Sequence, residues 1–159
     1  MNIVMLAIAF LAGVAISVQA AVNSRLAEGI GGNTIAAALT SFFVGTVLLA
    51  VIGVAKGGLQ SSLSALSSQP WWRFGGGFLG AAAIFSTVLL APRIGLANLL
   101  ALVIAGQLLA SLIIDNYGLI GVVIREATAV RIVGATVMLL GVVLTLFGDR
   151  LIARIGVAS

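Results

Sequence analysis

Two groups of amide, hydroxyl and carboxyl side chains carry the chemistry in this sequence that suits the binding of a small solute. Gln19 and Asn23 stand four residues apart, and Gln107, Ser111 and Asp115 repeat the same step. Residues at that spacing lie on one face of a helix, so each group predicts a polar stripe. Amides and hydroxyls both donate and accept hydrogen bonds. The stripes therefore favour recognition of a neutral or zwitterionic molecule.

Catalytic and metal chemistry has few possible participants. The chain contains no cysteine and no histidine, which removes thiolate ligands, the commonest metal ligand and the usual general base. Without a nucleophile–base pair or a metal cluster, the sequence predicts neither an enzyme nor a cofactor. Eight Lys and Arg residues are spread along the whole chain, so no nucleic-acid patch is expected.

The polar stripes belong to long apolar segments that predict membrane spans. Hydrophobic residues make up 62% of the 159 residues and charged residues 8%, whereas soluble domains carry about 25% charged residues. A helix needs about 20 apolar residues to cross a bilayer. We predict an all-α membrane protein with a single five-helix domain over residues 1–159 and with spans at approximately 3–24, 34–55, 72–91, 95–115 and 129–148.

The first apolar run also admits a signal-peptide interpretation, because "VQA" before Ala21 has small residues in cleavable positions. The basic n-region is missing and the apolar run exceeds a typical h-region, which favours a span.

Short polar segments separate the predicted spans. "EGIGGNT" at 28–34 predicts a loop with Asn33 or Thr34 as a helix N-cap. Residues 56–70 are rich in Gly and Ser and predict a flexible connection. "APRIG" at 91–95 predicts a tight turn. The apolar stretch "NYGLIGVVI" at 116–124 is too short to span, and it extends the fourth span, lies in the interface or re-enters the membrane; the sequence leaves all three open.

Positive charges flank the spans in equal numbers on both sides of the membrane. The N-terminal side holds Lys56, Arg73, Arg125 and Arg131, and the other side holds Arg25, Arg93, Arg150 and Arg154. An excess of such charges normally marks the cytoplasmic side. Either some positions count less and one orientation prevails, or the chain inserts both ways and two opposite copies pair as an antiparallel dimer.

Small residues at regular spacing predict close packing of helices, since they let backbones approach. Three stripes are present: Gly76 with Gly80, Gly13 with Ser17 and Ala21, and Gly134 with Gly141 and Gly148.

The polar side chains within the spans are expected to face the bundle interior, because an unpaired amide in hydrocarbon costs several kcal/mol. Besides the two stripes they include Thr40, Ser41, Thr46, Ser86, Thr87 and Asn98. Individually such groups are interhelical hydrogen-bonding partners; together they predict a lined cavity. Asp115 lies near a helix end that disfavours a negative charge. It therefore needs a helix that continues through "NYG", a cationic partner or water. No carboxylate lies in the middle of a span, which argues against exchange of protons for cations.

Five fragments, in this order and spacing, resemble the YdcZ-type branch of the drug/metabolite transporter superfamily: "QAAVNSRL", "ALTSFFVGT", "PWWRFGGGFLGA", "APRIG" and "AGQLLASLIIDNYG". The residues that match the recurring pattern of the branch are Gln19, Asn23, Ser41, Trp72, Gln107, Ser111 and Asp115. The superfamily's four-helix multidrug members carry a carboxylate in the first helix, where this chain has Gln19. Their proton-exchange mechanism is therefore not carried over.

The resemblance implies a half-size unit of a ten-helix inverted-repeat fold, which would pair with itself or a paralogous chain as an antiparallel dimer. It also implies an exporter in the bacterial cytoplasmic membrane. We predict a secondary transporter of a small molecule that works by alternating access. Its expected substrate-binding residues are Gln19, Asn23, Ser41, Gln107, Ser111 and Asp115. The alternative is a non-transporting membrane subunit that scaffolds or regulates another complex.

Overall fold

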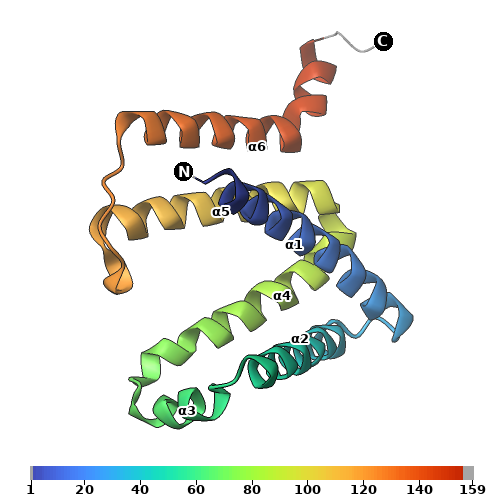
Figure 1. Ribbon diagram of the computed structural model, residues 1–159. Coiled ribbons are helices and arrows are strands. Elements are labelled where there is room, and N and C mark those ends of the chain that lie inside the picture. The colour runs from blue at the N-terminus through green and yellow to red at the C-terminus, as the bar shows by residue number, and fades with distance from the viewer. Residues whose placement is uncertain (1, 156–159) are drawn as a thin grey trace. The chain divides into compact units, whose positions relative to one another are not determined.

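The protein is built from five long apolar helices. The computed structural model describes residues 2–155, with side chains as far as Ala153, and this part of the chain forms helices and turns without a β-strand. Five helices are long and apolar enough to cross a membrane. They are α1 (Ile3–Gly29), α2 (Thr34–Lys56), α4 (Gly75–Ile94), α5 (Leu96–Tyr117) and α6 (Ala129–Ile155) (Figure 1). The predicted all-α polytopic membrane fold is confirmed.

The helices begin and end at residues whose backbone chemistry fits those positions. The Oδ1 of Asn33 accepts a hydrogen bond from the backbone N–H of Ala36 at 2.9 Å, so Asn33 is the N-cap of α2. This cap was one of the two expected from the sequence. Gly118 ends α5 in the left-handed conformation, with φ of 61°. Glycine adopts that conformation without the steric cost that a side chain would add.

Several predicted bounds differ from the structure, and the largest difference is at α6, which runs to Ile155 where the fifth span was expected to end at residue 148. Helix α1 continues through Glu28 to Gly29, where the predicted span ended at residue 24, and an ion pair between Arg25 and Glu28 (2.8 Å) spans its last turns. The expected turn at 91–95 is still helical through Ile94. The connection at 56–70 contains the short helix α3 (Leu59–Ser64) and a 3-10 turn, η1 (Ala65–Ser68). Serine hydroxyls in this connection bond to backbone carbonyls three residues earlier, which supports its turns.

The chain divides into two compact units, one over Met1–Arg93 and one over Ile94–Ser159. The single five-helix domain stays a prediction. In the first unit, Ala27 of α1, Ala37 of α2 and Val88 of α4 form a small buried core, and Val88 is only 1% exposed. The two alanines allow the helices to approach closely at this end. In the second unit, α5 packs against α6.

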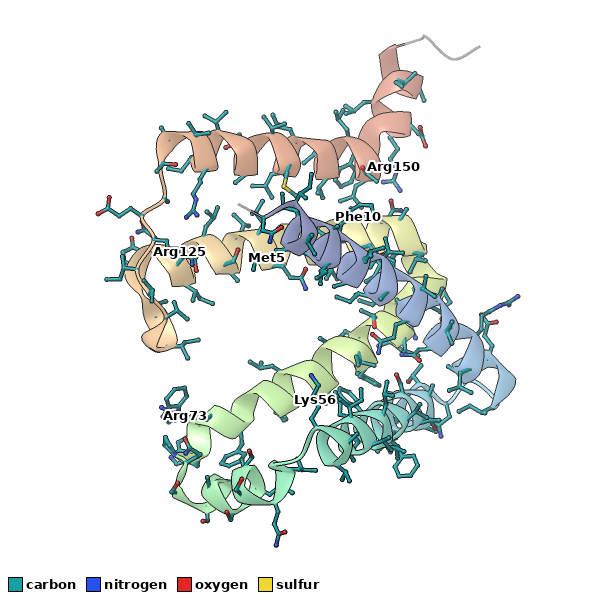
Figure 2. All side chains as sticks on the ribbon, viewed as in Figure 1. Met5, Phe10, Lys56, Arg73, Arg125 and Arg150 are labelled. Atoms are coloured by element: carbon teal, nitrogen blue, oxygen red, sulfur yellow. The ribbon has the colours of Figure 1, made fainter. Side chains whose placement is uncertain are left out.

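Most of the helical surface is apolar and uncovered by the rest of the chain. Only 6–11% of the most hydrophobic window of each span is buried. Figure 2 shows side chains consisting mainly of carbon around each long helix. A Cβ on Gly13, Gly76 or Gly77 would meet no atom within 4 Å, whereas one on Gly80 would lie 3.8 Å from Phe42. Of these four glycines, only Gly80 is close to another helix of its own unit.

Candidate functional site

Three of the predicted site residues meet between α1 and α2. The Nδ2 of Asn23 donates a hydrogen bond to the Oγ of Ser41 at 3.1 Å. The Nε2 of Gln19 donates to the same Oγ at 3.4 Å, a longer and weaker contact. We call Gln19, Asn23 and Ser41 the amide–serine cluster. The two amides lie on one face of α1, as their spacing predicted, and that face is turned toward α2.

The two amides of the cluster differ in their exposure to solvent. Asn23 is only 5% exposed, and Ser24 beside it is also buried. Gln19 is exposed, so it lies at the open side of the cluster. Because a buried amide without a partner is costly, the contact between Asn23 and Ser41 fixes the register of α1 against α2. Gln19 is tied less firmly and is freer to exchange Ser41 for another partner.

The cluster lies in a groove of about 680 Å³ between the two helices. Apolar side chains line most of this groove, and the polar residues in it are Gln19, Asn23, Thr40 and Ser41. Binding sites for small molecules have this composition, with a few placed polar groups among apolar ones, and have volumes of about 300–1,000 Å³. The Oγ1 of Thr40 donates to the carbonyl of Ala36 in its own helix, so its bonding is local.

The hydrogen-bonding capacity of the cluster is only partly used. The Oγ of Ser41 accepts from both amides, which leaves its own O–H proton free to donate. The amide oxygens of Gln19 and Asn23 can each accept a hydrogen bond. A ligand in the groove could therefore find donors and acceptors without a formal charge. This set suits a neutral or zwitterionic molecule.

The second predicted stripe lies on α5, in the other unit. Gln107 and Ser111 are exposed and Asp115 is half-buried. The Oγ of Ser111 donates to the carbonyl of Leu108 at 2.9 Å, a bond within its own helix. The part of the chain that the structure describes shows no side-chain bond from Gln107 or Ser111 to another helix. That this stripe and the amide–serine cluster face one cavity stays a prediction.

Asp115 lies in the last turn of α5, and the helix does not continue through "NYG" as one of the three alternatives required. Helix α5 continues past Asp115 for two residues, to Tyr117, before Gly118 ends it. Among the described side chains, the ion pair found is between Arg25 and Glu28, and none involves Asp115. The backbone carbonyl of Asp115 accepts a hydrogen bond from the N–H of Arg125 at 2.8 Å. Asp115 thus stands where the chain folds back after α5.

One polar residue at this end of α5, Asn116, was not among the predicted site residues. The Oδ1 of Asn116 accepts a hydrogen bond from the backbone N–H of Ala127 at 2.9 Å and joins the end of α5 to the segment before α6. An asparagine in the last turn of a helix, two residues before a glycine, was the available signal. The partner lies 11 residues away in sequence, which no local pattern specifies.

A second groove, of about 380 Å³, lies between α2 and α4 and is lined by apolar residues. Phe42 and Phe78 contribute to its lining from the two helices. It contains none of the predicted site residues.

Comparison with known proteins decides the family. A family model described as "Putative inner membrane exporter, YdcZ" matches residues 4–144. The inner membrane protein YdcZ of Escherichia coli (strain K12) is 32% identical over 138 residues, which cover 86% of this chain and 91% of that protein. The chain belongs to the YdcZ family. No solved structure matches it.

Membership of the YdcZ family confirms the resemblance found in the sequence fragments. The family is described as one of inner membrane exporters and not as an enzyme family. Together with the five apolar helices, it makes the chain a multi-pass inner membrane protein. The amide–serine cluster falls within the region that the family model matches.

Proposed function

We propose that this YdcZ-family chain exports a neutral or zwitterionic small molecule across the inner membrane. The observation that carries the proposal is the amide–serine cluster, in which Gln19 and Asn23 share the hydroxyl of Ser41 inside a groove of about 680 Å³. Hydrogen-bonding groups of both kinds are concentrated there, on two helices that are mostly apolar. The description of the family as an exporter supports outward transport.

Substrate binding would exchange hydrogen bonds within the cluster for hydrogen bonds to the substrate. The contact between Gln19 and Ser41 is the longer one, at 3.4 Å, and Gln19 is exposed. Gln19 is therefore the first group to turn toward a ligand, while the buried Asn23 holds Ser41 in place. A substrate that accepts from the Ser41 hydroxyl and donates to an amide oxygen would match the free groups.

The proposed transporter is an antiparallel dimer, formed with a second copy or a paralogous chain. Three observations support it: equal numbers of Lys and Arg on the two sides, spans that bury only 6–11% of their most hydrophobic windows, and a groove open along one side of α1 and α2. An odd number of spans inverts the second copy of a tandem repeat, and inverted repeats around a central site support alternating access. Two oppositely oriented copies would together provide ten spanning helices, the number in the inverted-repeat fold.

Gln107, Ser111 and Asp115 on α5 would complete the lining of the cavity. They are exposed or half-buried, and their four-residue spacing places them on one face. A polar face on a membrane helix is stable only against protein or water. The proposal assigns this face to the same substrate path as the amide–serine cluster.

The test compares transport by the parent chain and by Gln19→Leu and Gln107→Leu variants. Inverted membrane vesicles would be assayed for uptake of labelled amino acids and hexoses, which represent zwitterionic and neutral solutes. Both variants should lose transport of any compound that the parent accumulates. Gln69→Leu, the same exchange in the connection between α3 and α4, is the matched control and should transport normally.

Two results would contradict the proposal. Normal transport by correctly folded Gln19→Leu and Gln107→Leu variants would remove these amides from the substrate path. A stable complex with an unrelated membrane protein, together with no transport and no stabilisation of the purified chain by any tested compound, would favour the scaffold or regulatory subunit.

A further inference from the structure

The segment between α5 and α6 is folded back on itself. After Gly118 the chain makes a short 3-10 turn, η3 (Leu119–Gly121), and then returns to the end of α5 (Figure 1). The N–H of Arg125 bonds to the carbonyl of Asp115, and the N–H of Ala127 bonds to the side chain of Asn116. These two hydrogen bonds hold the two ends of residues 118–126 together. We call this segment the returning loop. The loop therefore has a defined shape.

The returning loop presents apolar side chains outward. Val123 is 79% exposed and Ile120 is 69% exposed. The other large apolar residues of the loop, also exposed, are Leu119, Val122 and Ile124. Loops that face water are normally polar. The connection between α2 and α4 also exposes large apolar side chains, but serines and glycines separate them there; the returning loop contains no serine or threonine.

The backbone conformation of Ile120 is a second unusual feature of the returning loop. Ile120 has φ of 62° and ψ of 16°, which is the left-handed region. Among the described residues, every other positive φ belongs to a glycine, including Gly118 and Gly121 of this loop. A β-branched residue in this region is strained. In water, an exposed isoleucine would add an unfavourable solvation term to that strain, whereas contact of its side chain with lipid would offset it.

The position of the loop in the chain places it at the membrane surface. Helices α5 and α6 both qualify as spans and pack against each other. The loop joins them at one end, and Tyr117 marks the end of α5. Tyrosine is typical of the headgroup level of a bilayer. Arg125, labelled in Figure 2, lies where the loop returns, and a guanidinium can bind lipid phosphate.

We propose that the returning loop is a membrane anchor that inserts into the leaflet at this end of α5 and α6. Ile120 and Val123 lie at the boundary between headgroups and acyl chains, and Arg125 binds the phosphates of the surrounding phospholipids. The occupant of this apolar surface is lipid. The anchor fixes the depth of the ends of α5 and α6 independently of any substrate.

The test measures the depth of a spin label on the loop in reconstituted vesicles of mixed zwitterionic and anionic phospholipid. The parent chain has no cysteine, so Val123→Cys gives a single labelling site, and Ser61→Cys in α3 gives a control in the polar connection. The label at Val123 should collide severalfold more with oxygen, relative to a water-soluble nickel chelate, than the label at Ser61. Its expected depth is about 5–10 Å below the headgroup surface.

Three outcomes would overturn the anchor. Equal exposure of both labels to the nickel chelate would place the loop in water. A label inaccessible to both relaxing agents would mean that protein, such as a second copy, covers it. A depth at the bilayer centre would make the segment a re-entrant one. Leu119→Cys provides a second labelling site if Val123→Cys does not fold.

Ile120→Asn distinguishes anchoring from a purely local structural role. Asparagine adopts the left-handed conformation more readily than isoleucine, so this exchange relieves backbone strain while it removes the apolar side chain. The label at Val123 should move toward water in this variant, with helix content unchanged. An unchanged label depth would contradict the role assigned to Ile120.

Discussion

Removal of the Ser41 hydroxyl tests the contact that joins α1 to α2. In Ser41→Ala, Asn23 loses its 3.1 Å partner and Gln19 loses its 3.4 Å partner. A hydrogen bond between membrane helices contributes about 0.6 kcal/mol on average and up to about 1.7 kcal/mol. The Asn23 bond should lie in the upper part of this range, because Asn23 is 5% exposed and a buried donor left unpaired costs about 1–3 kcal/mol. The Gln19 bond is long and exposed and should add little.

The expected loss of stability in Ser41→Ala is therefore about 1–2 kcal/mol, or roughly a 5- to 30-fold change in the ratio of folded to unfolded protein. Reversible unfolding in bicelles would measure it. Ser17→Ala is the matched control, since the Ser17 hydroxyl bonds only to the carbonyl of Gly13 in its own helix. This control should change stability by less than about 0.5 kcal/mol.

A double-mutant cycle isolates the pair. Asn23→Ala and Ser41→Ala, made separately and together, should show a coupling energy of about 1 kcal/mol, because each single change already removes their shared bond. Ser41→Ala that costs no more than Ser17→Ala, or strictly additive effects in the cycle, would refute the assigned contact.

Two further variants test the fold. Gly118→Ala should destabilise the chain by about 1–2 kcal/mol or more, because φ is 61° there and the new Cβ would lie 2.6 Å from the Cγ1 of Ile124. The control Gly141→Ala places its Cβ in open space within α6 and should not destabilise the chain. Unfolding measurements on both variants would show the difference. Val88→Ala should lower the free energy of unfolding by about 1–2 kcal/mol in the same assay, because Val88 is fully buried against α1 and α2. Val130 is exposed, so Val130→Ala should be close to neutral. Equal effects of the two changes would contradict the small core.

The sequence predicted the five helices because length and apolarity alone determine which segments can cross a bilayer. It also placed Gln19 and Asn23 on one face, because helical periodicity fixes that relation. It did not predict that Ser41 would be their shared partner. The bond from Gln19 joins residues 22 positions apart, and periodicity within one helix does not specify which face of another helix it meets.

Helix ends were predicted less well than helix cores. The sequence placed the end of the first span before Arg25, because charged residues are expected outside the hydrocarbon. In the structure α1 continues to Gly29, and Arg25 and Glu28 pair with each other within the helix. The fold of the returning loop depends on Asn116 bonding across 11 residues to Ala127, an interaction that hydropathy does not reveal.

Water access to the groove between α1 and α2 tests most directly whether the polar groups of the spans enclose a solute path. Val44 lines this groove, and its neighbour Phe43 does not, although both are exposed on α2 at nearly the same depth. In the cysteine-free parent, Val44→Cys should react with a hydrophilic, membrane-impermeant thiosulfonate in native membranes, and Phe43→Cys should remain unreactive in lipid. Equal reactivity at the two positions, or no reaction at Val44→Cys, would contradict a water-filled cavity at the amide–serine cluster.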